Sequence, residues 1–156
     1  MEIGQLYVRR SALINARPSR VWAEFKTFER IAAWLDRGHK LLVFDPCLGG
    51  KVEFSVDIEG IQRNFGGRIN TFEAERELSL SDDWIDKDFA FYACERTYWT
   101  FRLTAIAEST LVELFHHGYE NFGDDAHQIL EDYEIGWDNK HLKKLREIVE
   151  LDQSGN

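Results

Sequence analysis

The sequence predicts an α+β fold, in which a curved antiparallel sheet of about six to seven strands wraps around a long C-terminal helix. Hydrophobic residues recur with a period of two through most of residues 40–117, as in strands with one buried face. Helical periodicity occurs only near residues 18–35 and after residue 124. Because strands do not alternate with helices, a doubly wound α/β fold is excluded.

The first part of the chain predicts one strand and two short helices. Residues 5–16 alternate in polarity as a strand does. Pro18 suits the first turn of a helix, because the N–H that it lacks would have no partner there. Apolar residues then recur at helical spacing as far as Leu35, with an interruption near Thr27. We therefore expect two short helices with a bend near Thr27.

Six further strands, joined by turns, are predicted between residues 40 and 118. They comprise residues 40–46, 51–60, 61–74, 77–84, 96–106 and 109–118. The stretch IDKDFAFYACE, residues 85–95, predicts a less regular link. Gly66 and Gly67 indicate either a bulge or the close approach of another part of the molecule.

A single helix is predicted from Asp124, which can cap its start, to Glu150. Gly136 lies in the middle of this helix, where glycine costs about 1 kcal/mol relative to alanine, so some compensation is expected. Laid over the sheet, the helix would leave a gap lined by strand and helix residues, which would be a ligand cavity. We expect one domain over residues 1–156.

Composition excludes several classes of partner. The formal net charge is −9, which disfavours nucleic acid and anionic membranes. No apolar stretch reaches about 18 residues, so membrane insertion is not expected. The first residues lack the apolar run of a signal peptide, so we expect a cytoplasmic protein in which Cys47 and Cys94 are reduced. Aromatic residues make up 13% of the chain, including five Trp and eleven Phe, enough to line a cavity.

Several motifs in order resemble the START-like (SRPBCC) superfamily, and within it the group named after the activator of the heat-shock protein 90 ATPase. The resemblance covers about residues 8–150. It rests on the following motifs: Ala16-x-Pro18-x-x-Val21-Trp22; Trp34; GGKVEF; GGRINTFEAERELSLSDDW; the strand from Thr110 to Tyr119; and Gly136-Trp137 followed by Leu142 and Leu145.

The resemblance implies the helix-grip fold and a cavity that holds a hydrophobic molecule. Three departures weaken assignment to a named subgroup: EAERE replaces a proline-containing stretch, Thr27-Phe28 replaces Asp-Pro, and the last Trp-to-Leu spacing is one residue longer. The eukaryotic co-chaperone also has an N-terminal domain that these 156 residues do not include. Activation of a chaperone is therefore not carried over from the name of the group.

The adjacent histidines of LVELFHHGYENFG, His116 and His117, resemble a metal or catalytic pair. Successive side chains on a strand point to opposite faces, so the two rings diverge and do not readily chelate one metal. The group pattern His-x-Gly-aromatic aligns with His116, which would lie at the end of the cavity near Tyr119. There it would form a hydrogen bond to a polar group of a ligand, or it would only satisfy a carbonyl at the strand end or pack against the helix. We expect His117 at the surface or at an edge.

The candidate ligand-binding residues are those that the strand and helix patterns direct toward the cavity, mostly aromatic. They are Phe54, Trp84, Trp99, Phe101, Leu114, His116, Tyr133 and Trp137. The alternative is that these side chains fill the interior completely.

No catalytic residue is assigned, and Asp82, His116 and Tyr119 are the candidates if there is one. Asp82 is the one acid on the buried parity of its strand, where burial would raise its pKa and let it act as a general acid or base. The alternative is that it lies at the strand end, already in water. The sequence has no CxxC, HxH or HExxH spacing and no nucleotide-binding loop, so no metal and no cofactor are expected.

The main hypothesis is binding of a small hydrophobic, aromatic or lipid-like molecule, by a monomer or a homodimer. One alternative is an enzyme of the same superfamily, cyclase-like or hydrolase-like, that uses acid–base chemistry in the cavity. Another is a chaperone-associated interaction module, which would have a filled interior and a large exposed apolar patch.

Overall fold

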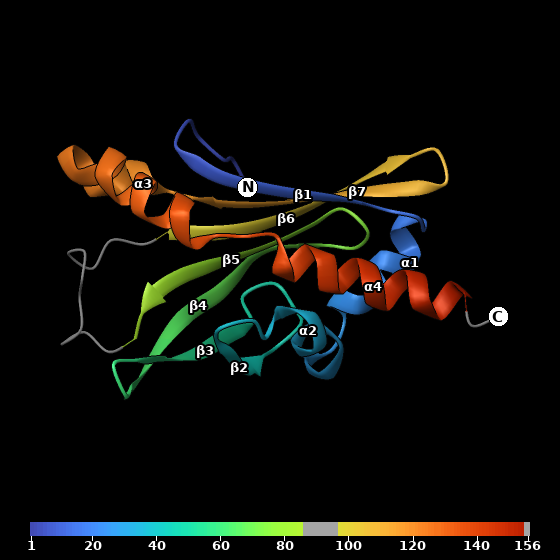
Figure 1. Cartoon of the computed structure of the whole chain (residues 1–156), viewed down its shortest axis with the longest axis horizontal. Helices are drawn as coiled ribbons and strands as arrows, with labels where there is room; N and C mark the ends of the chain where they lie inside the picture. The colour runs from blue at the N-terminus through green and yellow to red at the C-terminus, as the bar shows by residue number, and fades with distance from the viewer. Residues whose placement is uncertain (86–96, 155–156) are drawn as a thin grey trace.

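The computed structural model describes residues 1–85 and 97–154. None of the helices in these residues is long and apolar enough to cross a lipid bilayer. Figure 1 shows the arrangement of the elements. In chain order they are β1 (Tyr7–Ile14), α1 (Pro18–Trp22), the 3-10 helix η1 (Ala23–Phe25), α2 (Phe28–Leu35), β2 (Lys40–Phe44), β3 (Lys51–Ile58), β4 (Ile61–Glu73), β5 (Glu77–Trp84), β6 (Thr97–Ile106), β7 (Ser109–His117), the 3-10 helix η2 (Tyr119–Asp125), α3 (Ala126–Gly136) and α4 (Lys140–Ser154).

The seven described strands form one antiparallel sheet in the order β1-β7-β6-β5-β4-β3-β2. β1 pairs with β7 along its whole length, from Tyr7 opposite His117 to Ile14 opposite Thr110. The other neighbours in the sheet follow one another in sequence. The sheet is curved, and α4 crosses it beside α2 (Figure 1). The predicted α+β, helix-grip class is confirmed. The predicted link at residues 85–95 lies, apart from Ile85, outside the described residues.

The two short helices begin as the sequence predicts. Pro18 opens α1, and the Thr27 side chain accepts a hydrogen bond from the Arg30 N–H at the start of α2. Between them the carboxylate of Glu24, only 3% exposed, binds the Arg30 guanidinium at 2.8 Å. The Glu24 carbonyl also accepts the indole N–H of the buried Trp34 at 3.0 Å. The bend near Thr27 is therefore confirmed, and polar contacts hold it.

Gly66 and Gly67 lie where neighbouring strands leave no room for a side chain on β4. A Cβ atom on Gly66 would lie 2.2 Å from the Val52 carbonyl oxygen, and one on Gly67 would lie 2.6 Å from the Ser81 Cβ. Their φ angles, +143° and +157°, are also ones that other residues rarely adopt. Of the two alternatives that the sequence left open, close approach explains these glycines.

The single helix predicted from Asp124 to Glu150 is wrong. Asp124 lies in η2, and the helix is interrupted after Gly136, where Trp137 is extended with φ −85° and ψ 127°. A second helix, α4, then runs from Lys140. The interruption turns the indole of Trp137 toward β7, where it donates a hydrogen bond to His116.

Arg10 of β1 stabilises this interruption from the sheet. Its Nη2 donates to the carbonyls of Glu134 at 3.1 Å and Trp137 at 2.8 Å, and its Nη1 binds the Glu134 carboxylate at 3.0 Å. Carbonyls at the end of a helix have no partner in the helix, and a cation there is favourable. The amide of Asn139 adds a bond to the Ser11 carbonyl at 3.2 Å.

The prediction that His117 lies at the surface is wrong, since it is only 2% exposed. Its Nε2 lies 2.7 Å from the hydroxyl oxygen of Thr100, and its ring stacks on Tyr98. Burial, with the positive charges of His116 when protonated and of Arg102, lowers the pKa of His117 to about 4. The His117 side chain does point away from the helices, as the alternation along β7 predicts. At this position, however, the outer face of the sheet is also buried.

Candidate functional site

A cavity of about 510 Å³ lies between the sheet and the helices α3 and α4. This volume is typical of sites for small molecules. Asp132 and Gly136 of α3 are exposed and line it, so it reaches solvent along that helix. The lining combines aromatic rings with three aspartates, three histidines and one arginine: Arg37, His39, Val56, Ile58, Phe65, Asp82, Asp83, Trp84, Thr97, Trp99, His116, Phe122, Asp132, Tyr133, Gly136, Trp137 and His141.

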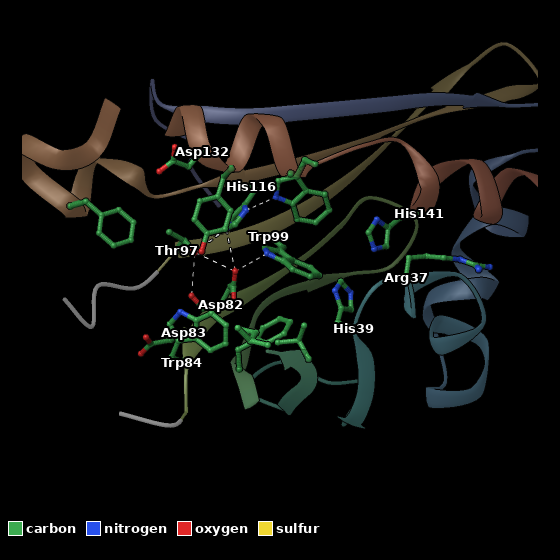
Figure 2. Close-up of a pocket in the computed structure, with 17 residues that line it drawn as sticks. Arg37, His39, Asp82, Asp83, Trp84, Thr97, Trp99, His116, Asp132 and His141 are labelled. Carbon is green, nitrogen blue, oxygen red and sulfur yellow. Dashed lines mark hydrogen bonds and ion pairs between the residues drawn. The ribbon is translucent and has the colours of Figure 1, made fainter. Parts of the chain in front are cut away.

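Asp82, Thr97, Trp99 and His116 meet in the middle of this cavity (Figure 2). They come from β5, β6 and β7, adjacent strands on which they share the inward parity. The Asp82 carboxylate accepts the Trp99 indole N–H at 2.9 Å and lies 3.2 Å from the His116 Nε2. That nitrogen also lies 2.9 Å from the Thr97 hydroxyl oxygen.

The hydrogen bonds of His116 fix its tautomer. Its Nδ1 lies 2.8 Å from the Nε1 of Trp137, and an indole N–H can only donate. Nδ1 must therefore accept with its lone pair, which places the proton of the neutral ring on Nε2. The Nε2–H then donates toward Thr97 and Asp82. His116 is 1% exposed, so each of its polar atoms is satisfied by protein.

This arrangement restricts the chemistry of His116. A nucleophilic triad needs the acid and the nucleophile on opposite ring nitrogens, so that one nitrogen is free to take the proton. Here Asp82 and Thr97 share Nε2, which already carries a proton, and Trp137 occupies Nδ1. These hydrogen-bonded side chains are therefore suited to form a rigid wall of the cavity. To accept a proton, His116 would first have to release the indole of Trp137.

A second histidine pair lines the cavity nearer to α4. The rings of His39, just before β2, and His141, in the first turn of α4, stack at 5.3 Å with an interplanar angle of 17°. Burial, reinforced by His39, lowers the pKa of His141 to about 4. Burial also lowers the pKa of His39, although the nearby Asp82 charge partly opposes this. Both rings are therefore neutral at pH 7.

Five of the eight predicted ligand-binding residues line the cavity: Trp84, Trp99, His116, Tyr133 and Trp137. Phe54, Phe101 and Leu114 do not, and are at most 2% exposed in the core. Phe101 and Leu114 pair across β6 and β7, farther along these strands, where α1, η1 and α2 already cover the sheet. Alternation along a strand tells which face a residue occupies, but not how far the cavity extends along it.

Of the catalytic candidates, Asp82 and His116 line the cavity and Tyr119 does not. Tyr119 is fully buried in a separate cluster with Val8 and Ile129, 5.2 Å from the His116 ring. Burial raises the pKa of its hydroxyl far above the usual value, so it stays protonated. Within the described residues that hydroxyl has no hydrogen-bond partner.

Six polar residues that line the cavity were not predicted from the sequence: Arg37, His39, Asp83, Thr97, Asp132 and His141. Thr97 has the same strand parity as Trp99, which would have been enough to find it. His141 precedes Leu142 on the apolar stripe of the last helix, which is a weak signal. His39 lies in the short loop RGHK, and no local pattern marks it. Among the described residues, no group of three or more His, Cys, Asp or Glu side chains could hold a metal ion.

A curved antiparallel sheet that holds helices over a cavity defines the helix-grip class of START-like folds. A profile of one family of this class, Activator of Hsp90 ATPase homolog 1-like protein, matches residues 15–150. The chain belongs to that family. Comparison with curated proteins found no match.

Solved structures of low sequence identity share the fold. A protein from Chromobacterium violaceum is 23% identical, with a TM-score of 0.70 over 93% of this chain and 97% of that one. A protein from Mesorhizobium loti is 21% identical, with a TM-score of 0.66 over 92% and 96%. The Aha1 dimer from Colwellia psychrerythraea is 12% identical, with a TM-score of 0.58 over 93% and 96%.

Proposed function

We propose that the protein binds a small, mainly apolar aromatic molecule in the cavity between the sheet and α3 and α4. The observation that carries the proposal is a 510 Å³ space lined by six aromatic side chains: Phe65, Trp84, Trp99, Phe122, Tyr133 and Trp137. Apolar surface that leaves water contributes roughly 25 cal/mol per Å² to affinity, and offset ring contacts add to this. A cytoplasmic location and a monomeric or homodimeric state stay predictions.

Binding should raise the melting temperature of the protein. A ligand present at 100 times its Kd stabilises the folded state by about 2.7 kcal/mol, or roughly 5–10 °C for a domain of this size. The measurement is thermal unfolding with a panel of flavonoids, fatty acids and aromatic polyketides, followed by calorimetric titration of the best compound.

Gly136 offers a variant that separates cavity binding from surface binding. A Cβ at Gly136 would meet nothing within 4 Å, and the residue lines the cavity. Gly136→Trp should therefore fill the space and abolish binding. Ile135→Trp introduces the same ring one residue earlier, at a position that is 87% exposed, and should leave binding intact. No shift with any compound, or equal binding by both variants, would contradict the proposal.

A second candidate is an acid–base reaction on a molecule in the cavity, in which Asp82 transfers the proton and His116, 3.2 Å away, holds the carboxylate in place. Both groups lie in one cavity within the distance that such chemistry requires. If this is the role, the compound that binds should be converted, and Asp82→Asn should reduce the rate at least 100-fold. Mass spectrometry of that compound after incubation is the test, and an unchanged compound would exclude this candidate.

A further inference from the structure

The stacked rings of His39 and His141 offer hydrogen-bonding atoms that the described protein does not use. His141 is only 6% exposed, and neither of its ring nitrogens has a partner among the described residues. The same holds for the Nε2 of His39. These nitrogens lie among aromatic side chains, with Trp99 5.5 Å from the His39 ring and Trp137 5.3 Å from the His141 ring.

A neutral imidazole has one N–H donor and one lone-pair acceptor. His141 therefore presents one donor and one acceptor, and His39 adds another polar nitrogen beside it. Leaving such buried groups unpaired costs free energy, so a binding partner that supplies both functions is favoured. Figure 2 shows the two rings facing each other at the end of the cavity away from Asp83 and Asp132.

The charges around the cavity select among possible partners. Three aspartates, Asp82, Asp83 and Asp132, line it, and Arg37 is the one arginine or lysine of the described lining. The side chain of Arg37 extends past His141, away from Asp82 (Figure 2). The charge of Arg37 acts on His141 and that of Asp82 acts on His39, and the lining as a whole is negative, so a carboxylate would gain little from two neutral imidazoles there. A hydroxyl is uncharged, and its single oxygen both donates and accepts.

We infer that the His39–His141 pair is a recognition site for the hydroxyl group of a phenol-type ligand. The flat rings around the pair would hold the aromatic part, and the two imidazoles would hold the hydroxyl. This inference rests on the proposed function and narrows it: the ligand is a hydroxylated aromatic compound and not a fatty acid.

Three naphthalenes with one ring system test the inference: 2-naphthol, 2-methoxynaphthalene and 2-naphthoate. We expect calorimetry at pH 7 to show that 2-naphthol binds about tenfold tighter than the methyl ether, which cannot donate. The carboxylate should bind most weakly. In His141→Phe, which keeps a ring but removes both nitrogens, the preference for 2-naphthol should disappear. His127→Phe, at an exposed position of α3, is the matched control and should keep it.

The outcomes separate this inference from the proposed function. Equal affinity for 2-naphthol and its methyl ether in the natural protein, or tighter binding of 2-naphthoate, would overturn the hydroxyl site while leaving an aromatic cavity. Persistence of the preference in both His141→Phe and His39→Phe would also overturn it. If none of the three compounds binds, both the hydroxyl site and the proposed aromatic ligand fail. The comparison in the natural protein needs no variant, so a folding defect in a histidine variant does not prevent the test.

Discussion

Gly66→Ala should destabilise the protein by roughly 3–4 kcal/mol. The new Cβ would lie 2.2 Å from the Val52 carbonyl oxygen, a backbone atom that can move only if β3 moves. The φ angle of +143° adds strain for any residue with a side chain. The adjacent Phe65 lines the cavity and pairs with Trp84, so ligand affinity should fall together with stability. Urea unfolding followed by circular dichroism measures the change.

Gly60→Ala is the matched control for this prediction. Gly60 also has a positive φ, +82°, but a Cβ there would meet nothing within 4 Å. It should cost only the backbone strain, about 1–2 kcal/mol. Equal losses in the two variants would show that the close approach of Val52 to Gly66 contributes nothing.

The second large effect is expected in mild acid, where two buried histidines, His117 and His141, and the half-buried His39 must accept protons. Burial lowers the pKa of His117 and of His141 to about 4, and it lowers that of His39 as well. In the unfolded chain these groups bind protons near pH 6.5. Between pH 6.5 and 4 the unfolded state therefore binds more protons, and the free energy of unfolding falls as the pH falls. Above pH 6.5 the neutral histidines make their full contribution to the free energy of unfolding.

His117 and His141 should each account for on the order of 2–3 kcal/mol of the fall in the free energy of unfolding by pH 4. This is a large part of the stability of a typical domain. The measurement is the free energy of unfolding at several pH values between 7.5 and 4. His117→Gln and His141→Gln should each show a shallower dependence on pH than the natural protein. His127→Gln, at an exposed position, should follow the natural curve. Parallel curves for all four proteins would contradict the prediction.

Much of the fold could be predicted because its signals are local. A period of two defines each strand between residues 40 and 84 within about two residues, and Pro46, Gly50 and Gly60 mark the turns before and after β3. The parity of β5 and β7 also placed Asp82 and His116 on the inner face. Pro18 and Thr27 act through the backbone beside them, so the start of each short helix was visible in the sequence.

The interruption after Gly136 was not predicted because much of what stabilises it is distant in the chain. The guanidinium of Arg10 binds the carbonyls of Glu134 and Trp137, more than 120 residues away. Helical periodicity continues on both sides, and it outweighs the local signals of Gly136 and of Asp138, whose carboxylate accepts the Lys140 N–H. The same holds for His39, which reaches the cavity only because β2 pairs with β3 and brings its loop beside α4.

The break between α3 and α4 also separates the residues that stabilise the core from those that line the cavity. Leu142, Leu145 and Val149 of α4 are at most 1% exposed in the main core, so exchanges there threaten folding itself. Tyr133 and Gly136 of α3 line the cavity, and α3 packs only against a smaller cluster. If the proposed function holds, substitutions in α3 should change the ligand preference with little loss of stability, whereas substitutions at these positions of α4 should destabilise the fold.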